Sequence, residues 1–156
     1  MRRKDREITN PEKIAEIILS CHCCRVGFYD DGEIYIVPLN FGYRESGGIR
    51  TFYFHAAKEG RKIDLISKSP SVGFEMDTNY KLKVSDIACA HSASFQSVIG
   101  TGRVTIVDSL QEKEAALQAI MYHNTHKEDW NFTKAMLNTV CIFKLEVAKL
   151  SCKEHA

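Results

Sequence analysis

The apolar positions near the start of the chain recur at the spacing of an α-helix. Asn10-Pro11-Glu12 supplies a capping side chain, a proline suited to the first helical position and an acid for the first turn. Ile14, Ile17 and Ile18 then fall on one face. The pattern therefore predicts a short helix that ends near Ser20.

Extended segments follow this helix. Residues 21–29 are compatible with a strand, and Asp30-Asp31-Gly32 is typical of a turn. A second extended run covers residues 34–43, and after a break at Ser46-Gly47-Gly48 a third covers residues 50–55. The order of these segments predicts a meander of three strands.

The rest of the chain alternates between helical and extended patterns. Residues 58–68 favour a helix that ends before Pro70, because proline disfavours helical backbone at the preceding residue. The further predicted elements are a half-buried strand with Val72, Phe74 and Met76 on one face, an excursion without a clear period over residues 78–93, an extended segment over 97–107, a helix opened by a capping box of Ser109 and Glu112, a helical turn at Phe132, Ala135 and Met136, and a last strand in which Phe143, Leu145 and Val147 alternate with polar residues.

These elements define a fold class. About six strands without regular βαβ alternation exclude a doubly wound parallel sheet. No G-x-G-x-x-G motif follows a strand, so a Rossmann nucleotide site is absent. We predict a mainly β protein, a largely antiparallel barrel with peripheral helices. Because no repeat or linker interrupts the pattern, we treat residues 1–156 as a single domain.

Composition and charge exclude several classes of partner. The 21 Lys and Arg residues nearly cancel the 20 Asp and Glu residues, which leaves a formal charge of +1 and no field to attract nucleic acid or an anionic membrane. No apolar run approaches the roughly 20 residues of a membrane helix, and residues 1–7 lack the apolar core of a signal peptide. We expect no nucleic-acid or membrane partner and a cytoplasmic protein.

The strongest local signal lies where the strand that ends at His55 leads into a basic turn. Lys58, Arg61 and Lys62 surround Gly60 at the predicted beginning of a helix. A helix N-terminus offers unpaired N–H groups to an anion, and arginine binds phosphate oxygens with a fork of donors. This turn is therefore a candidate phosphate site, with an ordinary solvated basic turn as the alternative.

The cysteines and the remaining histidines give weaker signals for chemistry. No CxxC pair is present, and on a strand Cys21 and Cys23 would share a face while Cys24 turns away, so we expect packed thiols and no metal site. We expect His123 and His126 to lie at a solvated helix end. The six cysteines are Cys21, Cys23, Cys24, Cys89, Cys141 and Cys152.

Hydrolytic chemistry has no support, because no serine lies in a G-x-S-x-G elbow. His55 differs from the other histidines because it ends an apolar aromatic strand and adjoins the candidate phosphate turn. A ligand bound at that turn could place its reactive ring near His55. The alternative is a histidine that serves packing or an interface.

Four segments of the chain carry a resemblance to a known family. They are residues 1–8, 35–43, 53–62 and 95–102. Through them the sequence resembles the NimA-like, 5-nitroimidazole-resistance branch of the pyridoxamine 5′-phosphate oxidase-like flavin-binding split barrels. The resemblance implies an antiparallel split β-barrel of the FMN-binding type, and a homodimer with FMN in a cleft between the subunits.

The resemblance also implies a set of flavin-binding residues. Arg61 and Lys62 would hold the flavin phosphate, with Gly60 and Lys58 beside them, and His55 would take part in catalysis. The main chain of residues 37–40 would line the ring edge. The full set implied for the cofactor is Val37, Pro38, Leu39, Asn40, Phe54, His55, Lys58, Gly60, Arg61, Lys62, Ser97 and Val98.

A flavin-dependent oxidoreductase is the function that the resemblance implies. It would take two electrons from a reduced nicotinamide or another donor and pass them to a 5-nitroimidazole or a related small acceptor. FAD is an alternative to FMN, haem and deazaflavin F420 are bound by some split barrels, and a non-catalytic flavin-binding dimer is a further alternative. Ala56, Phe95 and Gln96 depart from residues common in the branch, and the last two bear on substrate contacts.

Overall fold

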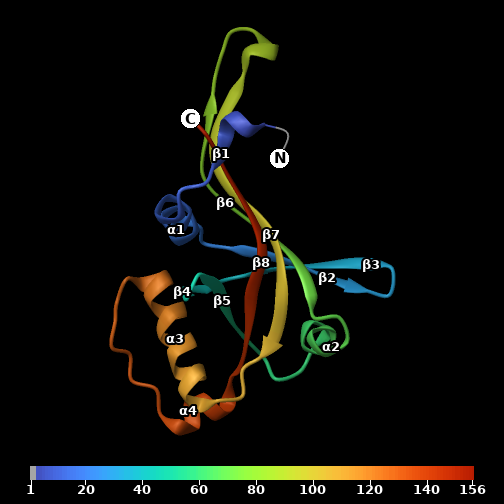
Figure 1. Ribbon diagram of the computed structural model, residues 1–156, viewed down its shortest axis with the longest axis vertical. Helices are drawn as coiled ribbons and strands as arrows, with labels where there is room; N and C mark the ends of the chain where they lie inside the picture. The colour runs from blue at the N-terminus through green and yellow to red at the C-terminus, as the bar shows by residue number, and fades with distance from the viewer. Residues whose placement is uncertain (1–2) are drawn as a thin grey trace.

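An antiparallel sheet of eight strands organises the computed structural model, which describes residues 3–156 (Figure 1). Met1 and Arg2, which begin the first segment of the family resemblance, lie outside the described residues. In chain order the elements are η1 (Lys4–Arg6), β1 (Glu7–Ile8), α1 (Pro11–Ser20), β2 (Cys24–Asp30), β3 (Glu33–Leu39), β4 (Gly42–Ser46), β5 (Ile49–Ala56), α2 (Arg61–Lys68), β6 (Ser71–Lys83), η2 (Ala88–Ala90), β7 (Ser92–Ile106), α3 (Leu110–Thr125), α4 (Lys134–Thr139) and β8 (Cys141–His155).

The strands are hydrogen-bonded in the order β3-β2-β6-β7-β8-β5-β4, with β1 added beside β8. Every pair in the described residues is antiparallel. The edge strands β3 and β4 do not pair with each other, so the sheet is open. The mainly antiparallel class with peripheral helices is thus confirmed.

The predicted three-strand meander is wrong. β2 pairs with β3 and β4 pairs with β5, but these two hairpins form opposite edges of the sheet. The chain leaves the sheet at Asn40 and Phe41 to cross between the edges. Phe41 is fully buried, and its ring lies 5.6 Å from that of Phe52 and 4.3 Å from that of His123. The crossing is therefore stabilised by core packing, which a strand pattern does not reveal.

Side-chain caps fix the beginnings of three helices. Asn10, Ser109 and Thr133 accept hydrogen bonds from the backbone of α1, α3 and α4, which confirms the predicted starts of α1 and α3. α2 differs, because Gly60 precedes it with φ +130° and provides no side-chain cap. α2 therefore begins at Arg61, not at residue 58 as predicted, and Lys58 lies in the connection before it.

Residues 78–93, predicted as an excursion, lie partly in strands: residues 78–83 belong to β6 and residues 92 and 93 to β7, whereas residues 84–91 connect the two. β6 and β7 continue past a bulge between Thr78 and Lys81 and form a long hairpin that projects from the body, with η2 near its tip (Figure 1). Leu82 and Val84 are both exposed there. Because neither face of this arm is buried, its residues show no alternation, and the sequence pattern does not indicate a strand.

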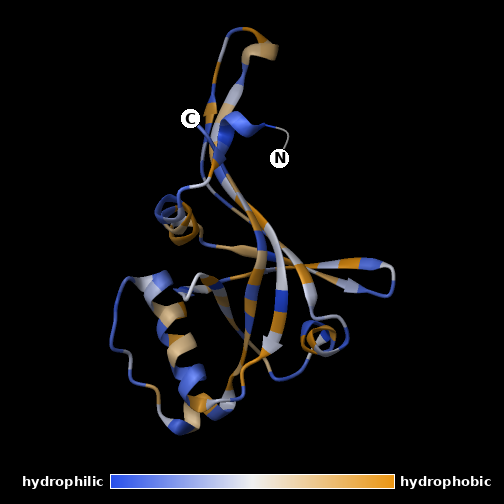
Figure 2. Ribbon diagram, viewed as in Figure 1, coloured by the Kyte–Doolittle hydropathy of each residue, from blue (hydrophilic) through white to orange (hydrophobic). Residues whose placement is uncertain are grey.

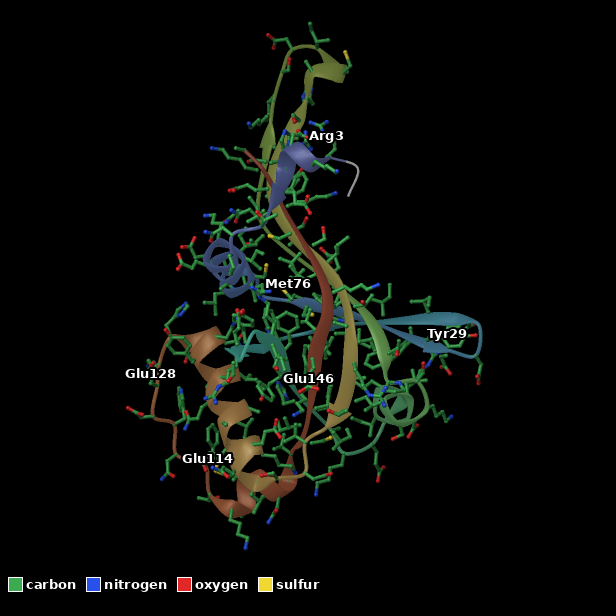
Figure 3. All side chains as sticks on the ribbon, in the orientation of Figure 1. Arg3, Tyr29, Met76, Glu114, Glu128 and Glu146 are labelled. Carbon is green, nitrogen blue, oxygen red and sulfur yellow. The ribbon has the colours of Figure 1, made fainter. Side chains whose placement is uncertain are left out.

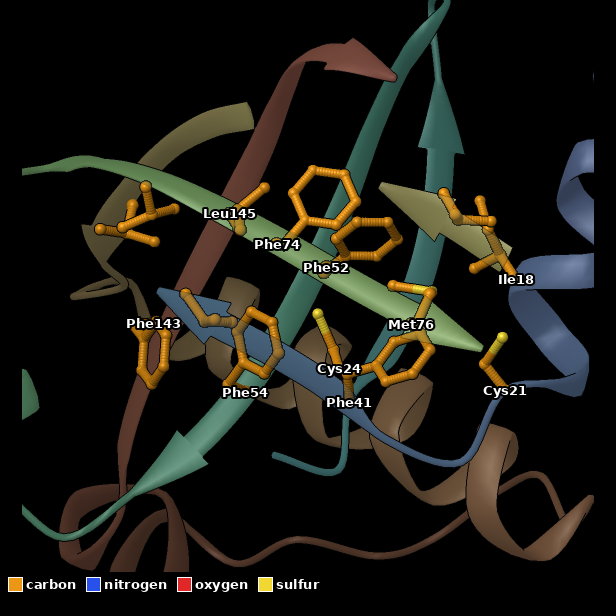
Figure 4. Packing of buried hydrophobic residues seen from close by; sticks show 14 of the residues in the cluster. Ile18, Cys21, Cys24, Phe41, Phe52, Phe54, Phe74, Met76, Phe143 and Leu145 are labelled. Atoms are coloured by element: carbon orange, nitrogen blue, oxygen red, sulfur yellow. The ribbon is translucent and has the colours of Figure 1, made fainter. Parts of the chain in front are cut away.

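Aromatic side chains fill the centre of the fold (Figure 4). The rings of Phe52 and Phe74 meet edge to face at 5.2 Å, and those of Phe54 and Phe143 stack at 4.9 Å. Each fully buried phenylalanine contributes up to about 3 kcal/mol of hydrophobic stabilisation. This packing fixes β5, and because side chains alternate along a strand, it turns His55 outward.

Candidate functional site

The α2 N-terminus is where sequence and structure place the candidate anion site. Arg61 is its first residue and lies beside the β2–β3 hairpin, on which Tyr29 is labelled in Figure 3. Its Nε atom donates to Asp30 Oδ2 at 2.8 Å, and its Nη2 atom lies 2.7 Å from the same oxygen in an ion pair. Nη2 also lies 3.6 Å from Glu33, and the guanidinium lies 4.4 Å from the centre of the Tyr35 ring. The hydrogen bond to Asp30 raises the pKa of Arg61.

Two lysines at the same turn have no such partners. None of the ion pairs within residues 3–156 involves Lys58 or Lys62. Burial raises the pKa of Cys141; Lys113 of α3, Lys62 and Lys58 oppose this rise, whereas Asp108 adds to it. Cys141 pairs across the sheet with Ala56, directly before this turn. The fold therefore gathers unpaired positive charge at the end of β5.

Lys113 was missed by sequence reasoning. Its Nζ atom donates to the carbonyl of Val140 at 3.5 Å, which places it beside the start of β8. No local motif joins it to Lys58 and Lys62, because about 50 residues separate them in the chain and only the pairing of β5 with β8 brings the two regions together. A surface lysine on a capped helix gives no signal of this proximity.

The backbone at the start of α2 also fits an anion. The Gly60 carbonyl accepts from Ile63 N–H at 2.8 Å and from Asp64 N–H at 3.2 Å, whereas no side chain caps the helix. The first N–H groups of a helix have no intrahelical acceptor and carry the positive end of its dipole. These residues can therefore bind a phosphate with backbone and lysine donors together.

His55 and Phe54 occupy opposite faces of β5. His55 is exposed, three residues before Lys58, so it lies at the edge of the basic turn. Phe54 is fully buried against Phe143, and any contact of residue 54 with a bound cofactor would be made by its main chain. Of the cofactor residues implied by the family resemblance, the structure brings together His55, Lys58, Gly60, Arg61 and Lys62.

The predicted residues of β3 lie elsewhere. Pro38 is exposed, and Val37 and Leu39 are half-buried. Asn40 donates from Nδ2 to the His22 carbonyl at 3.1 Å and lies 3.3 Å from Asn124 Oδ1. Residues 33 and 40 are about 23 Å apart at the usual rise of 3.3 Å per strand residue. Within one chain, the end of β3 is therefore remote from Arg61 at the hairpin tip.

Ser97 and Val98 form a third location, in the middle of β7. Val98 is fully buried and pairs with Met76 and Cys152, whereas Ser97 is half-buried. The predicted cofactor residues thus fall into three groups, at the start of α2, at the end of β3 and along β7.

The outer face of β2, β3 and β6 bears an apolar hollow of about 290 Å³. Figure 2 shows hydrophobic segments along the β2–β3 hairpin beside it. Gly27 and Gly73 pair across the floor of the hollow, and Ile34 and Ile36 flank it while remaining 66% and 61% exposed. A Cβ atom added at Gly73 would meet only the Gly100 carbonyl oxygen, at 3.9 Å, so packing within the chain does not require glycine there. Exposed apolar patches of this kind mark surfaces that meet a partner or a ligand.

The cysteines lie partly where the sequence predicts. Cys21, Cys24 and Cys152 are buried and free, which confirms their role in packing, and burial raises the pKa of Cys21 to about 12. β2 begins at Cys24, so Cys21 and Cys23 do not share a strand face as predicted; Cys21 follows α1 directly and is buried with Cys24. Among residues 3–156, no group of three metal-ligating side chains is found.

The prediction of a solvated position is wrong for His123. Its side chain is 5% exposed, its Nε2 donates to the Cys21 carbonyl at 2.7 Å, and its Nδ1 has no hydrogen-bond partner. Burial lowers the pKa of His123. His126 is exposed at the helix end with φ +55°, as predicted. His123 is buried by contacts with the Cys21 carbonyl and the Phe41 ring, which come from distant parts of the chain, so a local sequence pattern does not distinguish it from His126.

The protein is a split barrel by class. It has an open antiparallel sheet, peripheral helices and a basic turn after β5. Residues 10–154 match the pyridoxamine 5′-phosphate oxidase family, and the chain belongs to that family. The resemblance seen in the sequence is thereby confirmed. A search of curated proteins found no match.

Solved structures agree with this assignment. A candidate 5-nitroimidazole antibiotic resistance protein from Bacteroides thetaiotaomicron is 30% identical, with 95% of this chain and 86% of that chain covered and a TM-score of 0.81. The flavocytochrome Anf3 from Azotobacter vinelandii is 18% identical over 100% of this chain and 72% of its own, with a TM-score of 0.79. An FAD-binding protein from Mesorhizobium loti is 17% identical, covers 95% and 96%, and gives 0.66. The last two likenesses show the fold alone.

In the described part of the chain, no helix combines the length and the apolar character that a bilayer crossing requires.

Proposed function

We propose that this chain binds FMN and reduces 5-nitroimidazoles or related small acceptors. The observation that carries the proposal is the unpaired positive charge of Lys58 and Lys62 at the uncapped start of α2, beside the exposed His55. A single phosphate would neutralise this charge, and the family to which the chain belongs supports a flavin as its source. FAD is the alternative cofactor.

We further propose a homodimer that completes the flavin site. The predicted cofactor residues fall into three groups that one chain does not bring together. The apolar hollow beside Ile34 and Ile36 is a surface that a second copy would cover. A ring bound between two subunits could contact the start of α2 from one copy and the end of β3 from the other.

A bound flavin supplies two-electron transfer between a reduced nicotinamide, or another donor, and the acceptor. Lys58, Arg61 and Lys62 hold its phosphate, and the main chain of residues 37–40 orients the ring edge. His55 donates a proton to the reduced acceptor or positions it.

Titration of the apoprotein with FMN and with riboflavin tests the phosphate site. Arg61→Ala removes a charge-assisted hydrogen bond to the phosphate, so FMN affinity should fall about tenfold to a hundredfold. Riboflavin lacks the phosphate, and its affinity should not change. Arg44→Ala, an exposed arginine on β4 at the opposite edge, is the matched control. Unchanged FMN affinity in Arg61→Ala would show that the phosphate assignment is wrong.

A second measurement separates an enzyme from a binding protein. We expect the purified protein to show the paired near-ultraviolet and blue bands of oxidised flavin, and to reduce a nitroimidazole with a reduced nicotinamide. His55→Ala should lose turnover while it retains flavin. A single intense Soret band would instead identify haem, and absence of turnover with several donors and acceptors would favour a non-catalytic flavin-binding dimer.

A further inference from the structure

The tip of the β2–β3 hairpin carries a carboxylate that engages the candidate phosphate-binding arginine. Asp30 Oδ2 accepts a hydrogen bond from Nε of Arg61 at 2.8 Å and lies 2.7 Å from Nη2 in an ion pair. The Asp30 side chain is 23% exposed and that of Arg61 is 48% exposed, so the carboxylate is more shielded from solvent than the guanidinium. Glu33 and the Tyr35 ring, at 3.6 and 4.4 Å, contact the same guanidinium.

These contacts change what Arg61 can offer to an anion. Its Nε–Nη2 edge, which is one of the forks that bind two phosphate oxygens, is occupied by Asp30. One positive charge faces two carboxylates, so the hairpin tip is locally negative. Lys58 and Lys62, in contrast, form no ion pair with a carboxylate within residues 3–156. Binding of a phosphate through the Arg61 fork therefore requires that Asp30 give up this side chain.

We propose that Asp30 is a specificity-determining residue, which competes with a phosphomonoester for Arg61 and limits how strongly the site prefers FMN to riboflavin. This inference rests on the proposed phosphate role of Arg61. Asp30 acts through Arg61 and touches no reacting atom, so it is a positioning residue.

The test compares FMN and riboflavin affinity in hairpin variants by flavin fluorescence. Asp30→Asn should tighten FMN binding about two- to fivefold, the range expected when an exposed ion pair no longer competes. Riboflavin affinity should stay unchanged, and Asp30→Glu, which keeps the carboxylate, should restore wild-type behaviour. Asp31→Asn removes the same charge from the adjacent turn residue, which has no ion pair in the described residues and a φ of +47° that asparagine tolerates. It should leave both affinities unchanged.

A double-mutant cycle isolates the route through Arg61. In an Arg61→Ala background, Asp30→Asn should have no effect on FMN affinity. The proposal is overturned if Asp30→Asn leaves FMN binding unchanged or weakens it, if Asp31→Asn tightens it equally, or if the effect persists without Arg61. Asp30→Ser serves as a second neutral variant, and thermal unfolding shows that each variant is folded.

The same titrations distinguish this inference from the proposed function. A wild-type protein that binds FMN and riboflavin equally well refutes the phosphate site itself. A wild-type preference for FMN that Arg61→Ala reduces and Asp30→Asn leaves unchanged refutes only the role of Asp30.

Discussion

Substitution of Gly42 tests the packing that positions the connection between the two edge hairpins. Gly42 begins β4, directly after Asn40 and Phe41, and is buried against α3. A Cβ atom added there would lie 2.4 Å from Ile120 N, 2.5 Å from the Ala119 carbonyl carbon and 2.8 Å from Ile120 Cα. All three atoms belong to the helix backbone, which has no rotamer by which to move aside.

The magnitude of the effect follows from this geometry. Ordinary contacts of a Cβ atom begin near 3.4 Å, so α3 must shift by about 1 Å to admit the methyl group. α3 packs on the sheet through Ala116, Ala119 and Ile120, and the shift would loosen that interface. Overpacking of a filled core costs about 1–3 kcal/mol, and a backbone clash belongs at the upper end, so Gly42→Ala should lose about 3 kcal/mol of unfolding free energy.

Urea denaturation followed by circular dichroism measures this loss. Ser46→Ala, which changes an exposed residue at the other end of β4, is the control and should stay within about 0.5 kcal/mol of wild type. A Gly42→Ala protein within about 0.5 kcal/mol of wild type would refute the reasoning, since that is the range of surface substitutions without a packing effect.

Two further predictions concern buried titratable groups. Burial lowers the pKa of His123 below its ordinary 6.5, so the unfolded chain binds a proton that the folded chain does not, and stability should fall as the pH decreases from about 7.5 to 5.5. His123→Gln keeps a donor for the Cys21 carbonyl without titrating, so the advantage of wild type over this variant in urea unfolding should shrink over that range; a constant difference contradicts the assignment. A thiol reagent at neutral pH should label exposed Cys89 first, and Cys21, Cys24 and Cys152 only after unfolding, because burial raises the pKa of Cys21 to about 12 and that of Cys152 to about 11. Rapid labelling of all six thiols in the native protein would contradict this packing.

Local signals in the sequence predict where a helix or strand begins better than they predict which other strand it pairs with. Asn10 and Ser109 cap helices where the pattern places them, because a cap and its helix are contiguous in the chain. Whether β3 pairs with β4 is not encoded locally. The sequence pattern of the two hairpins would be the same if they formed one meander or lay at opposite edges of the sheet. In the structure the chain crosses between the two edges at Phe41. Its ring packs against those of Phe52 and His123, and these two residues are far apart from each other in the sequence.

The candidate site shows the same division. Residue types and spacing predict a basic turn beside His55, and the structure places Lys58 and Lys62 there without carboxylate partners in the described chain. The sequence does not show that Arg61 meets Asp30, which lies 31 residues away, or that Lys113 approaches from α3. Both contacts arise from the pairing and packing of the sheet, so the charge state of the turn depends on the whole fold.

Because the chain as a whole is nearly neutral, any attraction for an anion must come from a local group of charges. A formal charge of +1 over 156 residues leaves no field that would gather a polyanion. Lys58, Lys62 and Lys113 nevertheless all act on the Cys141 thiol at the start of β8, with Asp108 as the opposing charge, and none of the three lysines forms an ion pair within residues 3–156. At an ionic strength of about 0.1 M such a field is screened within roughly 10 Å. A site of this reach suits one phosphate group, which is the part of FMN that riboflavin lacks.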